Sequence, residues 1–399
     1  MNIVGIVGEY NPFHRGHAWH LARTREGLGA DCAIVCAMSG DFVQRGETAV
    51  FPKYARAEAA CRAGVDLVLE LPLPWCLASA EGFARGAVAL LAGVGCTHLS
   101  FGSECGELGR LTLAAAFLVS AQFNAHVQEL MEKNPSLSYA SARQAAADDV
   151  LGADAELLKT PNNILALEYL KAIYSLGLGI EPFTVQRRGA GHDETDGGEF
   201  KSAAELRRRM AQGVSLAGNV PVDALRVYER EMRRGRALLD SERLETAVLS
   251  RLRFLDEQAF LNLPDAADGL GRRLYLASRE EPTLEGVLTT AKSKRYALSR
   301  LRRMVCCAAL GVTAADQKGE PGYARVLAVN ARGREVLRLA RERGGLPVIH
   351  KSASIRLLGE QNRRIFALGS GAHDLAVLCC PNPLERRGGG DWRQSPVIL

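Results

Sequence analysis

The sequence predicts an α/β fold, in which a parallel β-sheet is covered by helices on both faces and is followed by a mostly helical C-terminal region. Short apolar runs, which we expect to be strands, occur at residues 3–7, 32–38, 65–71 and 98–101. The intervals between them hold helical patterns at residues 17–28, 53–63 and 82–91. Continuous apolar strands that alternate with helices are typical of parallel sheets buried on both faces.

The rest of the chain continues this pattern and then departs from it. Residues from about 111 to 178 are mostly helical in pattern, and residues 180–187 predict one more strand. We therefore expect a first domain over residues 1–212 with a helical insertion at about 111–178, and a mostly helical, basic region over residues 213–399. The tail around residues 386–391 contains a run of three glycines and is expected to be loose.

Composition and charge favour a globular protein without a membrane partner. Hydrophobic residues make up 47% of the chain and charged residues 24%, as in ordinary globular domains. No apolar run reaches the roughly 18 residues that a membrane-spanning helix needs. The first residues form a predicted strand without a basic leader or a cleavage site, so we expect a cytoplasmic location. The net charge of +5 permits a nucleic-acid partner without requiring one.

The cysteines give no sign of a metal centre. None of the ten lies in a CxxC pair, and several sit inside apolar runs, as at residues 32–36. We favour buried free thiols in a reducing compartment over a metal or disulfide role, and we predict no metal site.

The strongest local signal for function is a polar segment directly after the first strand, from Glu9 to His17. Pro12 ends the strand, and Gly16 lets the backbone approach a ligand at the mouth of the following helix. His14 and His17 could donate hydrogen bonds to phosphate oxygens and stabilise the charge that builds as pyrophosphate leaves. The sequence therefore predicts a triphosphate clamp with these two imidazoles as its catalytic groups. The alternative is a histidine pair that only caps the helix.

Other polar positions follow the later strands. Gly102 could let a nucleotide pack flat on the backbone, or it could form a plain turn. Lys53 and Arg56, one helical turn apart, either add positive charge near the phosphates or belong to a solvated helix face. Asn162 and Asn163 are natural helix-capping residues.

The segment His14-Arg15-Gly16-His17 after a first strand resembles the signature of the HxGH nucleotidyltransferase superfamily, which implies a Rossmann-like core and ATP as a substrate. The chain further resembles the tRNA(Met) cytidine acetate ligase family over nearly its whole length. Six segments carry this resemblance in order: Val7–His17, Met38–Glu47, Gly64–Pro72, Phe101–Glu104, Pro161–Leu165 and Lys294–Tyr296.

The resemblance implies a ligase that works in two steps. Acetate would attack the α-phosphate of ATP, which carries Mg²⁺, to give acetyl-adenylate and pyrophosphate. The exocyclic amine of the wobble cytidine in elongator tRNA(Met) would then take the acetyl group, giving N4-acetylcytidine and AMP. Because acetate is already ionised at neutral pH, the first step needs no general base. For the second step, the sequence singles out no proton acceptor.

The resemblance also implies which residues form the site. Those expected to bind ATP are Val7, Gly8, Glu9, Tyr10, Asn11, Pro12, Phe13, His14, Arg15, Gly16, His17, His20, Gly102, Asn162, Asn163, Arg187, Arg188, Ser202 and Arg207. Those expected near acetate or the cytidine are Ser39, Gly40, Gln44 and Arg45, for which a plain surface loop is the alternative. Ala204 departs from the family's Ser-Ala-Thr-Ala-Ile-Arg pattern, because it replaces a threonine whose hydroxyl could reach a phosphate.

The helical C-terminal region contains a dense basic stretch, with six cations among residues 291–304. Such a density, with Tyr296 and Tyr323 interleaved, suits phosphate contacts and base stacking on an RNA. A solvated helix face is the alternative. The candidates for binding tRNA are Lys292, Lys294, Arg295, Tyr296, Arg300, Arg302 and Arg303.

Two other functions compete with the ligase. One is an adenylyltransferase for a small metabolite, although such enzymes are commonly much shorter and have no need of a basic helical half. The other is a non-catalytic RNA-binding protein with a relict nucleotide fold. The intact His14, Gly16 and His17 disfavour it, since decay tends to remove such residues.

Overall fold

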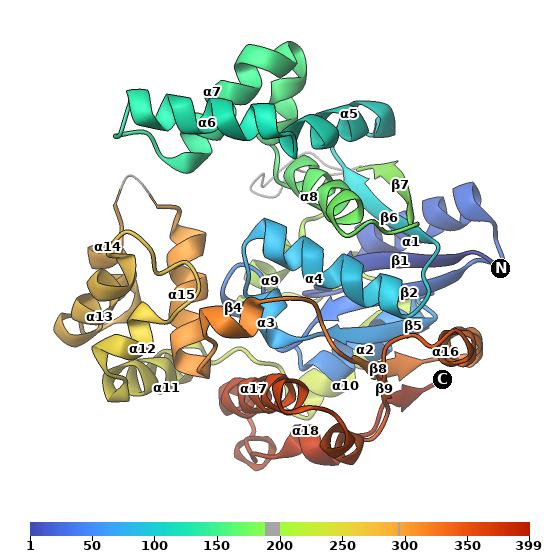
Figure 1. The fold of residues 1–399 in the computed structure, drawn as a ribbon. Coiled ribbons are helices and arrows are strands. Elements are labelled where there is room, and N and C mark those ends of the chain that lie inside the picture. Colours follow the sequence, from blue (N-terminus) through green and yellow to red (C-terminus); the bar gives the residue numbers. More distant parts are fainter. Residues whose placement is uncertain (188–199, 294–295) are drawn as a thin grey trace.

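The computed structural model describes residues 1–187, 200–293 and 296–399, which are organised around a central β-sheet with helices on both faces (Figure 1). The strand order is β10-β8-β5-β2-β1-β6-β7, and β9 pairs with β8. Five strands are the predicted ones and run parallel: β1 (Ile3–Gly8), β2 (Ala33–Ser39), β5 (Leu67–Leu71), β6 (His98–Ser103) and β7 (Glu181–Gln186). The predicted α/β core is therefore confirmed.

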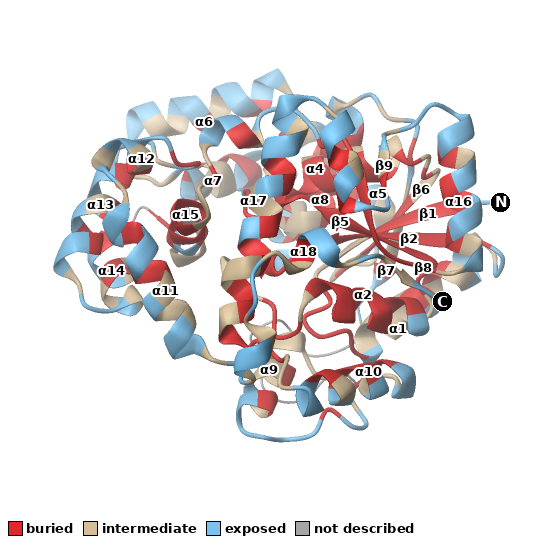
Figure 2. Ribbon diagram, turned by 90° about the horizontal axis from the view of Figure 1, so that it is seen from below, coloured by how far each residue is buried: buried red, intermediate tan, exposed pale blue. Residues whose placement is uncertain are grey.

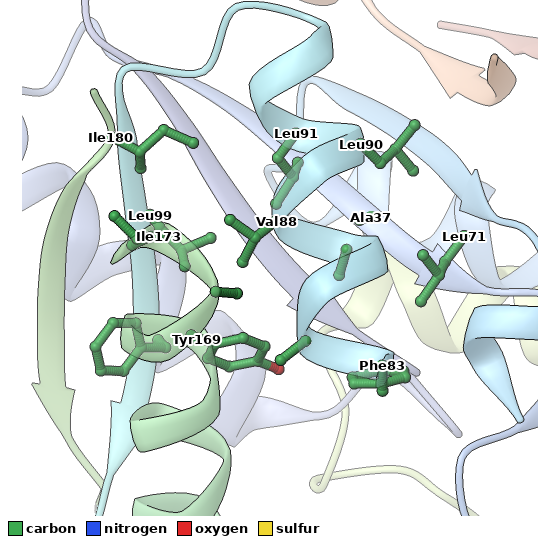
Figure 3. Packing of buried hydrophobic residues seen from close by; sticks show 14 of the residues in the cluster. Ala37, Leu71, Phe83, Val88, Leu90, Leu91, Leu99, Tyr169, Ile173 and Ile180 are labelled. Atoms are coloured by element: carbon green, nitrogen blue, oxygen red, sulfur yellow. The ribbon is translucent and has the colours of Figure 1, made fainter. Parts of the chain in front are cut away.

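Alternation along the strands divides the apolar side chains between the two faces of the sheet. The helices that cover these faces are α1 (Arg15–Leu28), α2 (Lys53–Arg62), α4 (Ala80–Gly93) and α8 (Pro161–Ser175). Ile3 packs in one cluster with α4 and α8, and its neighbour Val4 packs in another with α1 and α2. Val88 and Leu91 of α4 lie beside Ile173 of α8 over the first of these faces (Figure 3). Because both faces are covered, the central strands β1, β2 and β5 are largely buried and mostly apolar, whereas the edge strand β7 is partly exposed.

Helices occupy the chain between β6 and β7. They are α5 (Leu108–Leu118), α6 (Ala121–Lys133), α7 (Tyr139–Leu151), the 3-10 helix η1 (Gly152–Leu158) and α8. The first three carry the chain away from the sheet, so that α6 and α7 lie beyond α8 (Figure 1). Only α8 returns to the sheet, where its first residues meet the end of β6.

A second helical group follows the five parallel strands in the chain. It contains α10 (Val222–Arg233), α11 (Ser241–Phe254), α12 (Glu257–Leu261), α13 (Leu270–Glu280), α14 (Leu284–Ala291) and α15 (Leu298–Leu310). Helices α11 to α15 share an apolar cluster around Phe260, which continues to Phe42 in the loop after β2. Their outer faces are exposed and their buried residues gather between them (Figure 2). Within the described residues, no helix is both long and apolar enough to span a membrane.

The predicted boundary at residue 212 does not separate the sheet from the rest of the chain. β8 (Ala324–Val329) pairs antiparallel with β5, while β9 (Val348–Ile349) and β10 (Val397–Ile398) pair parallel with β8. All of β8 is buried. The C-terminal region is mostly helical as predicted, but it also completes one edge of the sheet.

Short elements and the last long helices complete the fold. They are β3 (Phe42–Val43), β4 (Glu47–Thr48), α3 (Leu73–Cys76), α9 (Ala203–Ala211), η2 (Ala314–Gln317), α16 (Ala331–Glu342), η3 (Ser352–Leu357), α17 (Glu360–Ala376), η4 (Val377–Cys379), η5 (Pro383–Glu385) and α18 (Gly390–Arg393). β3 and β4 pair as a small antiparallel hairpin in the loop after β2. This hairpin places the loop beside the carboxyl end of the sheet.

The tail around residues 386–391 is anchored, so the prediction of a loose tail was wrong. Asp391 is fully buried, and its Oδ2 lies 2.7 Å from Nζ of Lys53 and 2.7 Å from Nη1 of Arg325. Glu70 pairs with the same two cations, at 2.7 Å and 3.0 Å. A buried cation is tolerated only when an anion compensates it. Two buried cations therefore hold two buried anions, one of them from the tail.

The prediction of buried free thiols is confirmed for most of the cysteines. All ten are free, nine are buried, and Cys105 is partly exposed. Burial raises the pKa of the buried thiols, as for Cys36, where it reaches about 12. These groups therefore behave as small apolar side chains at neutral pH.

Candidate active site

A pocket of about 400 Å³ lies where β1, β6 and β7 end and where α1, α8 and α9 begin. β1 stands between β2 and β6 in the sheet, so the strand order changes direction at its end, which is where ligands of open α/β sheets bind. The predicted ATP-site residues that line the pocket are Val7, Gly8, Glu9, Tyr10, Asn11, His14, Gly16, His17, His20, Gly102, Asn162, Arg187, Ser202 and Arg207. These residues come from segments almost 200 residues apart in the sequence, and the fold places them around one pocket.

Five predicted ATP-site residues are not part of this lining, for reasons that differ. Phe13 is fully buried, and its backbone N–H donates to the hydroxyl of Tyr228 over 2.8 Å. Pro12 is buried and Arg15 is exposed, but neither reaches the pocket wall. Asn163 is buried at the start of α8. Arg188 lies outside the described residues.

His14 and His17 form the N-terminal cap of α1 and line the pocket at the same time. Nδ1 of His14 accepts a hydrogen bond from the backbone N–H of Gly16 over 3.0 Å. Nδ1 of His17 accepts one from the backbone N–H of His14 over 3.1 Å, and the two rings stack with centroids 3.8 Å apart. A neutral imidazole whose Nδ1 accepts must carry its proton on Nε2. The cap therefore fixes both rings as Nε2–H donors.

Burial keeps these imidazoles neutral. Desolvation, with a smaller contribution from the nearby Arg187, lowers the pKa of His14 to about 3. Desolvation and the neighbouring His14 place the pKa of His17 well below its usual value. The clamp is thus a pair of neutral hydrogen-bond donors at neutral pH, and it does not rely on imidazolium charge.

His20 continues the histidine row one turn further along α1, and a hydrogen-bond chain fixes its tautomer. The hydroxyl of Thr24 donates to the carbonyl of His20 over 2.8 Å, so it must accept from Ser100, 2.7 Å away. Ser100 in turn accepts from Nε2 of His20 over 2.9 Å. Burial lowers the pKa of His20 to about 4, with help from Arg187. His20 is therefore neutral and held by its Nε2, which leaves Nδ1 without a proton.

Reciprocal hydrogen bonds tie the turn after β6 to the start of α8. The Glu104 carboxylate accepts from the backbone N–H groups of Asn162 over 3.1 Å and Asn163 over 2.6 Å, at the start of α8. The side-chain oxygen of Asn163 accepts from the backbone N–H of Glu104 over 2.9 Å. Asn163 is thus an internal tie, while Asn162 and Gly102 reach the pocket. A side chain at Gly102 would meet Arg187, since an added Cβ would lie 3.2 Å from its Cγ.

The segment around α9 closes the pocket from the opposite side. Ser202 caps α9, and its hydroxyl accepts from the backbone N–H of Glu205 over 3.2 Å. Arg207 donates to the backbone carbonyl of Asn11 over 3.0 Å and to the carboxylate of Glu47 over 2.9 Å. Arg207 thus bridges the loop after β1 and the loop after β2.

Of the four residues expected near acetate or the cytidine, the structure brings two to the pocket. Gln44 and Arg45 line it, and the backbone N–H of Gln44 donates to Oε1 of Glu9 over 2.9 Å. Ser39 is fully buried, and Gly40 presents its carbonyl to the guanidinium of Arg56. Both of these positions therefore help to hold the loop through Arg56, and neither is part of the pocket lining.

Arg56 and Lys53 have structural roles, so the alternative of a solvated helix face is wrong, and neither side chain is part of the pocket lining that would place it near the phosphates. Both are fully buried. Arg56 donates to the backbone carbonyls of Phe51 over 2.9 Å and Ser39 over 3.2 Å, and also to those of Glu9 and Gly40. It joins the ends of β1 and β2, and Lys53 is used in the buried ion pairs of the tail.

Several pocket residues were missed by sequence reasoning. They include Trp19, Glu47, Ala80, Phe83, Phe101, Ile164, Leu165 and Tyr169. Most are apolar residues of α4, β6 and α8, whose helical or strand spacing is indistinguishable from that of core residues. Glu47 follows Gly46 in a segment that the sequence did single out, so its polarity was the one available signal.

The basic candidates divide into exposed and buried groups. Lys292 and Arg302 are exposed and Arg300 is half-buried. Arg303 is buried with Asp265, their charged groups 3.6 Å apart, and Tyr296 is buried under the guanidinium of Arg300. The expectation that Tyr296 and Arg303 face an RNA was therefore wrong.

The prediction of an RNA contact also named Tyr323, Lys294 and Arg295. Tyr323 is also buried, packed against the ring of Phe366, so it offers no stacking surface. Lys294 and Arg295 lie outside the described residues. Among the described residues, no group of three or more His, Cys, Asp or Glu side chains is placed to hold a metal ion.

Comparisons with known proteins show the family of this chain. The family model described as HIGH Nucleotidyl Transferase matches residues 1–389. A tRNA(Met) cytidine acetate ligase of Syntrophomonas wolfei is 34% identical over 415 aligned residues, which cover 100% of this chain and 99% of that protein. Another from Syntrophotalea carbinolica is 37% identical and covers 94% of this chain and 90% of the relative.

Solved structures give the same answer in three dimensions. Apo TmcAL of Thermotoga maritima superimposes with a TM-score of 0.94 at 30% identity, with 100% of both chains covered. The crystal structure of the same protein bound with alpha-thio ATP matches with a TM-score of 0.90. The resemblance first based on six short segments thus extends over the whole chain, which belongs to the tRNA(Met) cytidine acetate ligase family of HIGH nucleotidyltransferases.

Proposed function

We propose that this chain is an ATP-dependent ligase that activates acetate as acetyl-adenylate and transfers the acetyl group to N4 of the wobble cytidine in elongator tRNA(Met). The observation that carries the proposal is the neutral pair His14 and His17 at the start of α1, each with Nδ1 engaged and Nε2–H available. AMP and diphosphate are the other products.

The first step depends on stabilising negative charge, and it requires no proton transfer. Acetate is ionised at neutral pH and attacks the α-phosphate in line with the departing pyrophosphate. The Nε2–H groups of His14 and His17, at the start of α1, stabilise the charge that grows on the leaving group. Because the imidazoles are held by the cap, little reorganisation is needed during the reaction.

The adenosine part of ATP is proposed to lie over the ends of β6 and β7. Gly102 and Asn162 line that side of the pocket, together with apolar residues at the start of α8. Gly102 has no side chain, which allows a base or ribose to approach the backbone. Arg187 is the proposed polar contact on this side, while Ser202 and Arg207, from the segment around α9, are proposed to border the phosphates.

Mg²⁺ is proposed to arrive on the triphosphate. The carboxylates that line the pocket among the described residues are Glu9 and Glu47, and Glu47 already pairs with Arg207. With so few carboxylates in the pocket, the site suits a magnesium ion that is held by phosphate oxygens and water. Bound in this way, the ion would neutralise charge on the phosphates.

The tRNA is proposed to contact the C-terminal region, residues 213–399, where Lys292 and Arg302 are exposed. Gln44 and Arg45 are the proposed contacts to acetate or the cytidine. A cytoplasmic location fits a tRNA-modifying enzyme and is part of the proposal. A small-metabolite adenylyltransferase is disfavoured, because full-length relatives share the entire C-terminal region as well as the nucleotide site.

The direct test is to incubate the purified protein with ATP, Mg²⁺, labelled acetate and unmodified elongator tRNA(Met), and then to digest the tRNA. The proposal predicts label in N4-acetylcytidine and none when ATP is left out. Acetate-dependent exchange of pyrophosphate into ATP without any label in the tRNA would overturn the proposed acceptor. Absence of both signals would overturn the adenylating chemistry itself.

A further inference from the structure

Acetyl transfer to a cytidine requires a group that removes a proton from the exocyclic amine. Two carboxylates line the pocket among the described residues, Glu9 and Glu47. Glu47 is 38% exposed and is paired with the guanidinium of Arg207 at 2.9 Å. Glu9 is half-buried, and its Oε1 accepts from the backbone N–H of Gln44. Glu9 is thus the pocket carboxylate that accepts its hydrogen bond from the backbone, whereas Glu47 is paired with a cation.

The position of Glu9 in the fold favours contact with the acceptor. It directly follows β1, the strand at which the order of the sheet changes direction. The nucleotide side of the pocket comes from β6, β7 and the start of α8, whereas the hydrogen bond to Gln44 joins Glu9 to the loop after β2. Glu9 therefore lies between the proposed ATP side and the proposed cytidine side.

The chemistry of a carboxylate also separates Glu9 from its neighbours His14 and His17. A carboxylate repels a triphosphate, so direct phosphate contact is a poor use of this side chain. The exocyclic amine of cytosine, in contrast, is a hydrogen-bond donor that Glu and Asp accept from in nucleic-acid complexes. An accepting carboxylate beside the amine is already placed to take its proton.

The surroundings of Glu9 adjust its basicity. Burial raises the pKa of its carboxyl and the negative charge of Glu47 raises it further, while the bond from Gln44 and the cations Arg207 and Arg56 lower it. The net effect is a pKa above the usual value, which makes the ionised form a stronger base. The titratable groups that face Glu9 are Glu47 of β4, Arg207 of α9, Arg56 of α2, Tyr169 of α8 and Cys76 of α3.

We propose that Glu9 accepts the proton that the cytidine amine loses during acetyl transfer; this inference rests on the proposed function. The amine nitrogen attacks the acyl carbon of acetyl-adenylate, and a carbon–nitrogen bond forms. The bond from that carbon to the phosphate oxygen breaks, and its electron pair leaves with AMP. The N–H proton passes to the Glu9 carboxylate, which afterwards releases it to water.

The test compares the two half-reactions in Glu9→Gln, a variant of nearly the same shape. Pyrophosphate exchange into ATP with acetate measures adenylate formation, and label in N4-acetylcytidine measures transfer. We expect transfer to fall at least ~100-fold further than exchange, the usual size of a general-base contribution. An equal loss in both assays would instead indicate a role in ATP or Mg²⁺ binding, and transfer at the wild-type level would rule out a proton acceptor. Either result overturns the inference, whereas wild-type protein inactive in both assays overturns the proposed function.

A pH profile separates a base from a positioning group. Transfer by the wild-type protein should rise with pH as Glu9 ionises, and Glu9→Gln should lack this rise. Glu47→Gln removes a negative neighbour and frees Arg207, so the pKa of Glu9 should fall and the rise should move to lower pH. A profile that is the same in wild-type protein and Glu47→Gln would contradict the assignment.

Discussion

The backbone N–H of His14 donates a hydrogen bond to Nδ1 of His17 over 3.1 Å. The sequence left two interpretations of this pair open, a helix cap and a phosphate clamp. The structure shows the cap, and the cap prepares the proposed clamp, because the two tasks use opposite nitrogens of the same ring. Capping through Nδ1 leaves Nε2–H as the donor that faces a ligand. Local structure and proposed chemistry therefore depend on one tautomer.

The neutral histidines of the pocket predict a loss of stability in mild acid. His14, His17 and His20 have pKa values below the usual 6.5, with His14 at about 3 and His20 at about 4. Below pH 6.5 these imidazoles become protonated in the unfolded chain but stay neutral in the folded chain. The free energy of unfolding therefore falls as the pH drops. Each group can contribute up to about 1.4 kcal/mol per pH unit.

Urea unfolding at pH 7.5 and 5.5 measures this effect. We expect the free energy of unfolding to be lower at pH 5.5, and His14→Asn to reduce the difference, since asparagine caps a helix but does not titrate. His373 acts in the opposite direction, because Asp41 raises its pKa against the effect of burial. An unchanged difference in His14→Asn would show that His14 is not held neutral.

At Gly46 the loop after β2 lies close to α15, so an added side chain should disturb this contact. Its φ is +75°, and an added Cβ would lie 2.5 Å from the backbone carbon of Arg302 in α15. Gly46→Ala should cost about 1–2 kcal/mol for the left-handed backbone and about 1–3 kcal/mol more for the clash. Gly213 has the same φ and nothing within 4 Å of an added Cβ, so it is the matched control.

The two alanine variants can be compared by urea unfolding and by acetyl transfer. Gly213→Ala should lose only the backbone part of the stability and keep its transfer rate. Gly46→Ala should lose more stability, and its transfer should slow because Gln44 and Arg45 are displaced. Equal behaviour of the two variants would mean that the packing of α15 on this loop is unimportant.

The anchored tail predicts a large effect of a single carboxylate that is not part of the pocket lining. Asp391→Ala would leave Lys53 and Arg325 without one of their two buried counter-ions, at a cost of about 3–5 kcal/mol. Asp223→Ala breaks an exposed pair with Arg226 and should cost less than about 1 kcal/mol. Unfolding in urea compares the two, and similar small losses would contradict the structural role of Asp391.

The part of the site that the sequence predicted is the part encoded locally. From Glu9 to His17, a strand, a turn and a helix start follow one another within a few residues, so the chemistry could be inferred from spacing. Gln44 and Arg45 were similarly found in a polar loop after a strand. The buried role of Arg56 could not be found in this way, because it depends on four carbonyls that only the folded chain brings together.

The fold likewise has parts that are encoded locally and parts that depend on distant segments. Four of the five parallel strands were predicted because each is a local apolar run, and helical patterns separate these runs, while residues 180–187 predicted the fifth. β8 was missed, because its pairing with β5 joins segments more than 250 residues apart and its six residues stand among arginine-rich helical stretches. The glycines before Asp391 suggested a loose tail, since nothing local reveals that Lys53 and Arg325 require its charge.

The most direct test of the account is pyrophosphate exchange into ATP with acetate, in the absence of tRNA, for His17→Asn and His17→Gln. Asparagine can still accept from the His14 backbone at the place of Nδ1, but it has no donor at the place of Nε2. Glutamine reaches about as far as Nε2 and keeps a donor there. We predict that exchange falls ~100- to 1,000-fold in His17→Asn, as for loss of one transition-state donor, and much less in His17→Gln. Exchange near the wild-type rate in folded His17→Asn would contradict the central claim that His17 stabilises the leaving pyrophosphate through Nε2–H.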